Sequence, residues 1–147
     1  MSAELPDDLQ HRFVAFVRAF GLHRPEQTPC GAPVAVSEAH ALSVIDERGP
    51  LSQNDLAHHL ELAKSTVSRM VDQLERRGWV QRGTSDADGR RRLVELTAEG
   101  EKVAGEIAHR RRARLADLLE RIPEGDRAAV LGALDTLVEA ARDTPAP

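Results

Sequence analysis

Residues 50–97 decide the fold, and they read PLSQNDLAHHLELAKSTVSRMVDQLERRGWVQRGTSDADGRRRLVELT. Leucine and alanine recur at helical spacing behind Ser52, a residue type that caps the open amide groups at the start of a helix. Asp55 stands where a capping box places its second side chain. The pattern predicts a first helix of about two turns. A short connector, 61–63, follows it.

A second helix is expected from Lys64 to Arg77, because an apolar stripe continues to Leu74 and Gly78 then stops it. The opposite face, near the helix start, carries short hydroxyls and cations that can enter a major groove and meet base edges or phosphates. These candidate site residues are Lys64, Ser65, Thr66, Ser68 and Arg69. The pattern indicates that this helix reads duplex DNA.

Two stretches of alternating residues follow, at 79–82 and 93–96, and the turn signal Asp88-Gly89 lies between them. Residues 79–97 are therefore expected to form a β-hairpin wing. Arginines crowd its returning edge, and we expect Arg90 and Arg91 to reach a minor groove and the phosphates beside it.

These segments resemble the MarR (multiple antibiotic resistance regulator) family of bacterial transcription factors. The resemblance rests on five motifs in the family's order and spacing, namely Leu51-Ser-Gln-Asn-Asp-Leu-Ala57, Lys64-Ser-Thr-Val-Ser-Arg69, Leu74-Glu-Arg-Arg-Gly78-Trp79-Val80, Asp86-Ala-Asp-Gly-Arg90 and Leu96-Thr97-Ala-Glu-Gly100. It implies a triangular homodimer whose terminal helices form the interface and whose winged lobes each read one half-site. It also implies that ligand binding or oxidation changes the spacing of the two lobes.

We therefore expect one mainly α-helical domain over residues 1–147, with a small β-hairpin wing. Residues 5–21 and 98–143 would form a helical dimerisation region, and 37–97 a winged helix-turn-helix lobe with a reader helix at 64–77 and a wing at 79–97. The expected function is that of a sequence-specific transcriptional regulator, a homodimeric repressor controlled by a small-molecule effector. Its partner would be double-stranded DNA carrying a pseudo-palindromic operator, with half-sites about 34–36 Å apart.

The segments around this lobe also have helical patterns. All three phenylalanines lie on one face of the first helix, which the resemblance assigns to a partner subunit. Ser37 is expected to cap a helix that ends near Gly49, and Thr97 to cap a long one. Pro123-Glu-Gly-Asp126 would open the last helix. The arginine run at 110–114 is expected to be a solvated face.

Composition limits the possible functions. The chain has 147 residues, a formal net charge of -4 and a pI near 5.9, so bulk positive charge does not explain binding to nucleic acid. Eight of the 20 basic and seven of the 24 acidic residues lie in 50–97, a net of +1, which concentrates the acid elsewhere. A single cysteine, no secretion signal and no apolar run of membrane-spanning length lead us to expect a cytoplasmic protein with no membrane partner.

The sequence also bears on four alternative functions. Cys30, in a proline-rich loop, could make the protein a redox-responsive regulator of the same fold. A zinc-responsive regulator would use Cys30 and His40, with a further ligand from His11, His23, Glu38 or His109. A winged helix can also bind protein rather than DNA. An enzyme is disfavoured because the chain has no nucleophile elbow, zinc-protease motif or phosphate loop, and we expect no cofactor.

Overall fold

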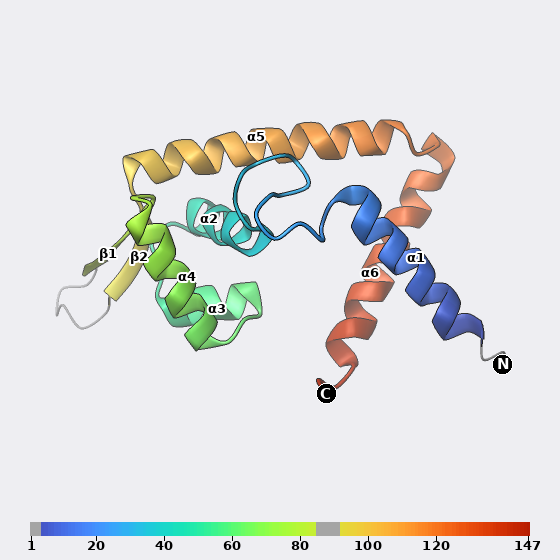
Figure 1. Ribbon diagram of the computed structural model, residues 1–147, viewed down its shortest axis with the longest axis horizontal. Helices are drawn as coiled ribbons and strands as arrows, with labels where there is room; N and C mark the ends of the chain where they lie inside the picture. The colour runs from blue at the N-terminus through green and yellow to red at the C-terminus, as the bar shows by residue number, and fades with distance from the viewer. Residues whose placement is uncertain (1–3, 85–91) are drawn as a thin grey trace. The chain divides into compact units, whose positions relative to one another are not determined.

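The computed structural model describes residues 4–84 and 92–147, and the chain divides between Arg111 and Arg112 into two compact units (Figure 1). The first unit holds α1 (Glu4–Phe20), α2 (Val36–Arg48), α3 (Gln53–Leu60), α4 (Lys64–Arg76), β1 (Val80–Thr84), β2 (Arg92–Leu96) and the first part of α5 (Ala98–Glu120). The second unit holds the rest of α5, a 3-10 turn (Glu124–Asp126) and α6 (Arg127–Asp143). The predicted fold class, mainly α with a two-stranded hairpin, is confirmed.

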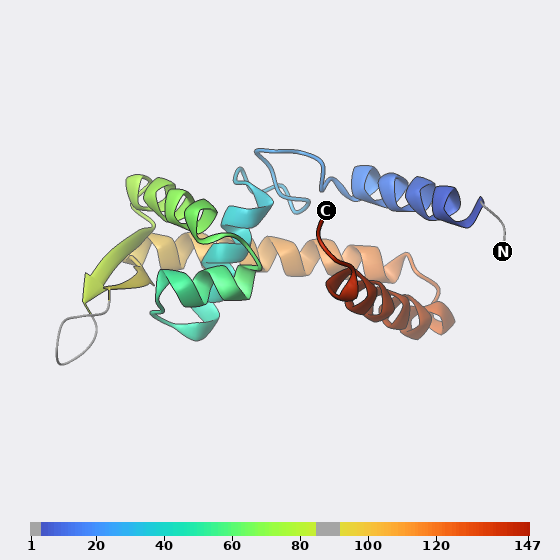
Figure 2. The ribbon, with the colours of Figure 1, turned by 90° about the horizontal axis from the view of Figure 1, so that it is seen from below.

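The core of the first unit lies between α2, α3, α4 and the hairpin. Helix α3 contacts both α2 and α4, while β1 contacts α4 and β2 contacts α2 (Figure 2). Each of these elements contributes at least one side chain that is almost fully buried. The largest are Leu42, Ile45, Leu56, Leu74, Val67, Val71, Val80 and Val94. Truncating a leucine in such a core to alanine costs about 2–5 kcal/mol, so this packing fixes the position of α4.

The helix-turn-helix forms where the sequence predicted it. The amide of Asp55 donates to the Ser52 hydroxyl over 3.1 Å at the start of α3. At the end of α4, Gly78 has φ +78°, a left-handed conformation that favours glycine, and the amide of Trp79 donates to the Leu74 carbonyl over 3.1 Å. The predicted start and end signals are confirmed, with α4 ending at Arg76 and Arg77 as its C-cap.

The wing is an antiparallel pair in which Val80 faces Leu96 and Thr84 faces Arg92. Each strand extends beyond its predicted bounds, toward the hairpin turn, because pairing continues past the alternating residues. A contact the sequence did not predict adds Leu51 to this sheet: its amide and carbonyl exchange hydrogen bonds of 3.1 and 2.8 Å with Val94. The segment that leads into α3 is thereby tied to the wing.

Thr97 joins the end of α4 to the start of α5. Its hydroxyl donates to the Gly78 carbonyl over 2.6 Å and accepts from the Gly100 amide over 3.0 Å, which confirms the predicted cap. A Cβ added to Gly100 would collide with the Trp79 carbonyl. The first turn of α5 therefore needs glycine there.

Two predictions about where helices begin are corrected. Helix α2 begins at Val36, with Ala35 as its N-cap and no capping side chain, because the helical bonding already starts with the Ala39 amide donating to the Ala35 carbonyl over 3.0 Å. Ser37 therefore lies inside the first turn. The segment after Pro123 makes a 3-10 turn, and α6 starts only at Arg127.

The arginine run on α5 is exposed, as predicted, but two of its residues also make contacts that the sequence did not predict. Arg110 Nη1 donates to the Gly31 carbonyl over 3.1 Å, and Arg111 Nη1 donates to the Ser43 hydroxyl over 2.8 Å. Two arginines of this exposed face thus also anchor the loop before α2, and α2 itself, to α5.

In residues 4–84 and 92–147, no helix combines the length and the apolar character that crossing a bilayer requires.

Candidate nucleic-acid interface

The reader face is the exposed side of α4. The buried stripe of this helix consists of Val67, Met70, Val71 and Leu74. On the other side, Lys64, Ser65 and Arg69 are exposed, and Thr66 and Ser68 are half-buried. The structure therefore brings the five sequence-derived candidates together on the first two turns of one helix, accessible to a partner. These five residues are called the reader face below.

The start of α4 adds backbone donors to the reader face. Ala63 is the N-cap, no side chain caps the helix, and the first turn contains no acidic residue. The first amide groups of a helix have no partner within the helix, and the helix dipole makes this end attractive to anions. Because Lys64 adds a full positive charge here, the start of α4 suits a phosphate group.

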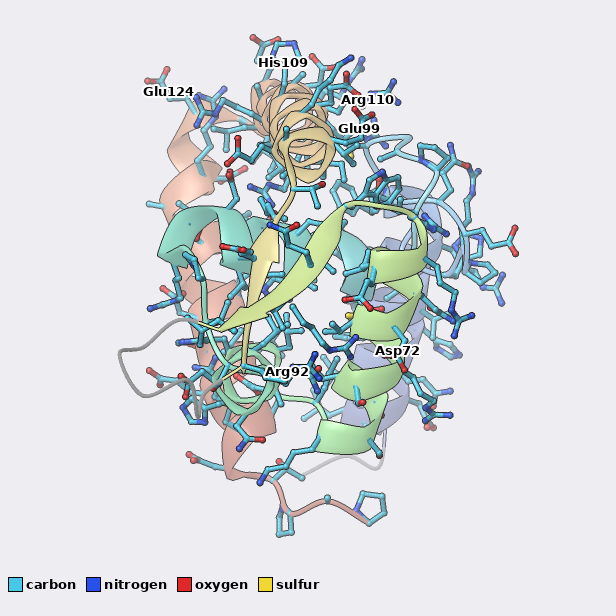
Figure 3. All side chains as sticks on the ribbon, turned by 90° about the vertical axis from the view of Figure 1, so that its left-hand side faces the viewer. Asp72, Arg92, Glu99, His109, Arg110 and Glu124 are labelled. Carbon is cyan, nitrogen blue, oxygen red and sulfur yellow. The ribbon has the colours of Figure 1, made fainter. Side chains whose placement is uncertain are left out.

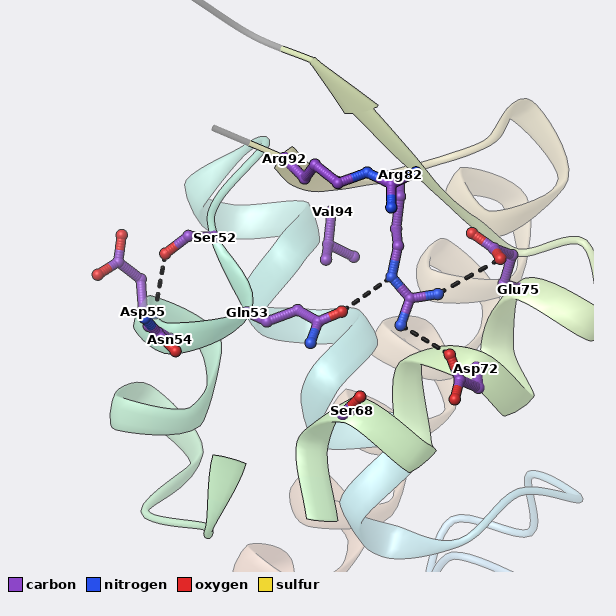
Figure 4. Close-up of a pocket in the computed structure, with 10 residues that line it drawn as sticks. All are labelled: Ser52, Gln53, Asn54, Asp55, Ser68, Asp72, Glu75, Arg82, Arg92 and Val94. Atoms are coloured by element: carbon purple, nitrogen blue, oxygen red, sulfur yellow. Dashed lines mark hydrogen bonds and ion pairs between the residues drawn. The ribbon is translucent and has the colours of Figure 1, made fainter. Parts of the chain in front are cut away.

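Behind the reader face lies a charge cluster centred on Arg82 of β1 (Figure 4). Arg82 Nε donates to Gln53 Oε1 over 2.8 Å, Nη2 to Asp72 Oδ1 over 2.7 Å, and Nη1 to Glu75 Oε1 over 3.3 Å. The Arg82 side chain is only 16% exposed, whereas the carboxylates of Asp72 and Glu75 are 46% and 45% exposed. One guanidinium thus links the first strand of the wing to the start of α3 and to α4.

The Arg82 cluster lines a polar cavity of about 850 Å³ that also includes Ser52, Ser68 and Arg92. Sequence reasoning missed the cluster. A signal was present, since strand alternation places Arg82 on the same face as Val80, which is 1% exposed. A charged residue at a position facing the core requires partners, and Asp72 and Glu75 lie one turn apart on α4 to provide them.

The described part of the wing adds Arg92 to this surface. Arg90 and Arg91 lie outside the described residues. Arg92 is exposed at the start of β2. Figure 3 shows it together with Asp72 of α4, which lines the same cavity. Arg92 therefore adds a cation to the lining of the cavity beside α4.

The candidate sensor residues do not form one site in the structure. Cys30 is half-buried, and its Sγ lies 2.9 Å from the Thr28 hydroxyl, which in turn accepts from the Ala32 amide over 3.0 Å. His40 is exposed on α2. Within the described ranges, which include all the proposed zinc ligands, no three His, Cys, Asp or Glu residues are grouped so that they could hold a metal ion.

Comparisons of the sequence place this geometry among known regulators. Residues 35–91 match the sequence profile of the MarR family. A protein from Thauera aromatica, whose name assigns it to transcriptional regulation of the hcr operon, is 30% identical over 105 residues, covering 71% of this chain and 63% of that protein. The regulator YwoH from Bacillus subtilis is 42% identical over 59 residues, 40% of this chain and 42% of its own length. The chain thus matches less than two thirds of either relative.

Solved structures share the fold. A MarR-like transcriptional regulator from Thermotoga maritima superposes with a TM-score of 0.66 and 28% identity, covering 98% of this chain and 99% of that one. FabT from Streptococcus pneumoniae, solved in complex with DNA, has a TM-score of 0.72 at 20% identity, over 95% and 96% of the two chains. The fold and the reader face are those of a winged helix-turn-helix protein. Residues 35–91 match the MarR family, and the related sequences and structures confirm the resemblance that the motifs indicated.

Proposed function

We propose that this protein is a sequence-specific transcriptional regulator that binds a pseudo-palindromic operator in double-stranded DNA. One observation carries the proposal: α4 buries one stripe of its surface and exposes Lys64, Ser65 and Arg69 on the other. Hydroxyl and guanidinium groups are the partners that base edges and phosphates require in a major groove. A protein-binding face would more often present aromatic or aliphatic anchors.

In this proposal α4 enters the major groove with its N-terminal end first. Lys64 and the open amides of the first turn hold a phosphate, while Ser65, Thr66, Ser68 and Arg69 contact base edges. Arg90 and Arg91 of the wing reach the neighbouring minor groove. The Arg82 cluster keeps the wing strand in a fixed direction relative to α4, so that both contacts occur together.

The operator is bound by a homodimer. Helix α1 exposes a stripe in which Leu5 is 58%, Leu9 53% and Phe13 56% exposed. Helix α6 has no buried residue and exposes Leu131 by 59% and Leu134 by 47%. Apolar faces of this extent mark interaction surfaces, and a second copy of the chain would cover them. Two reader helices then face half-sites about 34–36 Å apart on the DNA.

Regulation by a small effector completes the proposal, with the protein acting as a repressor in the cytoplasm. The related fold of PcaV from Streptomyces coelicolor was solved with its natural ligand, at a TM-score of 0.70 and 22% identity. In this chain, an effector would bind where the dimer body meets the winged lobe and favour a lobe spacing that does not fit the operator.

The proposal is tested by selecting bound sequences from a random pool of double-stranded DNA. The expected result is a two-fold symmetric motif whose half-sites are one helical turn apart. The variant Arg69→Ala should lose the motif, whereas Lys102→Ala, which removes an exposed cation on α5, should keep it. Failure to enrich any sequence at low ionic strength would refute the proposal.

A further inference from the structure

A second cavity lies where α2 begins and α4 ends, away from the Arg82 cluster. It has a volume of about 650 Å³ and includes residues from the loop before α2. Its lining contains two carboxylates, Glu26 and Glu38, and two guanidinium groups, Arg76 and Arg77, and the apolar side chains of Pro33 and Val34 also line it. A wall with balanced charges of both signs differs from the cationic surface that DNA requires.

Glu38 is the unusual member of this wall. The residue is 8% exposed, and its Oε2 atom is buried without a hydrogen-bond partner. Arg77 Nη1 lies 3.8 Å from that oxygen, close enough for electrostatic attraction but too far for a hydrogen bond. A buried carboxylate oxygen without a donor is unfavourable, so an N–H or O–H group that reached this oxygen would stabilise it.

The two guanidinium groups indicate that the other end of a ligand carries a negative charge. Arg76 and Arg77 are both exposed at the end of α4. A guanidinium binds a carboxylate in a planar, bidentate geometry. The C-terminal end of a helix is also favourable for a positive group, which suits an ammonium placed between Glu38 and the end of α4.

We propose that this cavity binds a small zwitterion of the α-amino-acid class. Its ammonium group takes the place of the Arg77 guanidinium beside the Glu38 carboxylate, and its carboxylate pairs with the guanidinium of Arg76. The side chain of the ligand lies against Pro33 and Val34. The inference goes beyond the proposed function, because binding here requires neither DNA nor a second copy of the chain.

The structure also provides a built-in reporter. Trp79 is the only tryptophan, the chain has no tyrosine, and the Arg77 guanidinium lies over the Trp79 ring at 4.9 Å from its centroid. A ligand ammonium at Glu38 competes with Arg77 for the same oxygen. Occupancy therefore changes the surroundings of Trp79, which lies between α4 and β1.

The test is a titration of the purified full chain, without DNA, with each common L-amino acid at millimolar concentration. Trp79 fluorescence and heat release are both recorded. We expect a saturable change for at least one amino acid, and binding at least about tenfold weaker for the N-acetyl and the amide derivatives of that amino acid, because each derivative removes one charge. Equal binding of the derivatives, or no response to any amino acid, would overturn the proposal.

Variants identify the site. Glu38→Gln and Arg76→Gln should each weaken binding about tenfold or more, whereas Glu47→Gln, an exposed carboxylate at the other end of α2, should bind like the wild type. If Glu38→Gln does not fold, Arg76→Gln decides, since its side chain is exposed. Unchanged binding in Arg76→Gln would refute the assignment. If the protein binds DNA but no amino acid, the assignment of this cavity is refuted and the proposed function is unaffected.

Discussion

Two groups of charged side chains on and beside α4 differ in how they are partnered. Lys64 and Arg69 are exposed and form no ion pair with the residues that the structure describes. Arg82, on the adjacent strand, is 16% exposed and donates hydrogen bonds to α3 and α4. The first group is available to a partner, while the second is committed to the geometry of the lobe. The comparison indicates that partnering within the chain, rather than charge itself, separates residues that bind from residues that position.

The largest expected effect is on DNA binding by the reader face. Arg69→Ala should weaken binding to the selected operator by about 1–3 kcal/mol, because a guanidinium contact to a base edge or phosphate is lost. Its free energy of unfolding should change by no more than about 0.5 kcal/mol, as expected for an exposed residue. Fluorescence anisotropy with labelled DNA and urea unfolding measure the two quantities. If Arg69→Ala lowered stability but retained affinity, Arg69 would be a positioning residue and not a DNA-binding one.

For the Arg82 cluster, a loss of stability is expected. Arg82→Ala should lower the free energy of unfolding by about 1–2 kcal/mol, less than for a fully buried pair because Asp72 and Glu75 are about half exposed. Urea unfolding gives the value. Arg82→Lys is the matched control: it keeps the charge but cannot hold all three acceptors in one plane, so an intermediate loss is expected. An unchanged unfolding midpoint in Arg82→Ala would show that the cluster has no structural role.

The wing gives a smaller and more uniform effect. Arg90→Ala should weaken binding to operator and random DNA alike, and it should reduce the slope of affinity against salt by about one, as for one lost phosphate contact. Titrations at several salt concentrations provide the slope. A loss restricted to the operator would instead assign Arg90 to base recognition.

The smallest effect is expected at Cys30. Cys30→Ser keeps a polar group beside the Thr28 hydroxyl, so the free energy of unfolding should change by less than about 0.5 kcal/mol. Operator binding before and after mild peroxide should be the same in the wild type and in the variant. A peroxide response that is present only in the wild type would establish redox control through Cys30.

The sequence predicted the parts of the fold that depend on local chemistry. The Ser52 cap, the end of α4 at Gly78 and the exposed reader face follow from residues a few positions apart. Local patterns failed where distant residues meet. Arg82 and Gln53 are 29 positions apart, Arg111 and Ser43 are 68, and Arg110 and Gly31 are 79. Helical or strand periodicity contains no information about such pairs, so the cluster behind the reader face and the role of the arginine run became visible only in three dimensions.

The wrong prediction of Ser37 as the N-cap of α2 has a local cause. Ser37 has the right chemistry for a cap, but the backbone of Ala35 already has the extended conformation of an N-cap, with φ -64° and ψ 149°. Glu38 is then in the first turn, where the helix dipole favours its carboxylate. The position of the helix start therefore also places Glu38 in the cavity that we assign to a zwitterion.

The double use of the Thr97 hydroxyl has a mechanical consequence. Because one oxygen atom bonds both the carbonyl that follows α4 and the amide that opens α5, and Gly100 leaves no space against Trp79, these helix ends cannot swivel independently. A tilt of the first turn of α5 would therefore also move the C-terminal end of α4. In the proposed complex with DNA, the angle at which α4 meets the double helix would thus be set from the C-terminal end of α4.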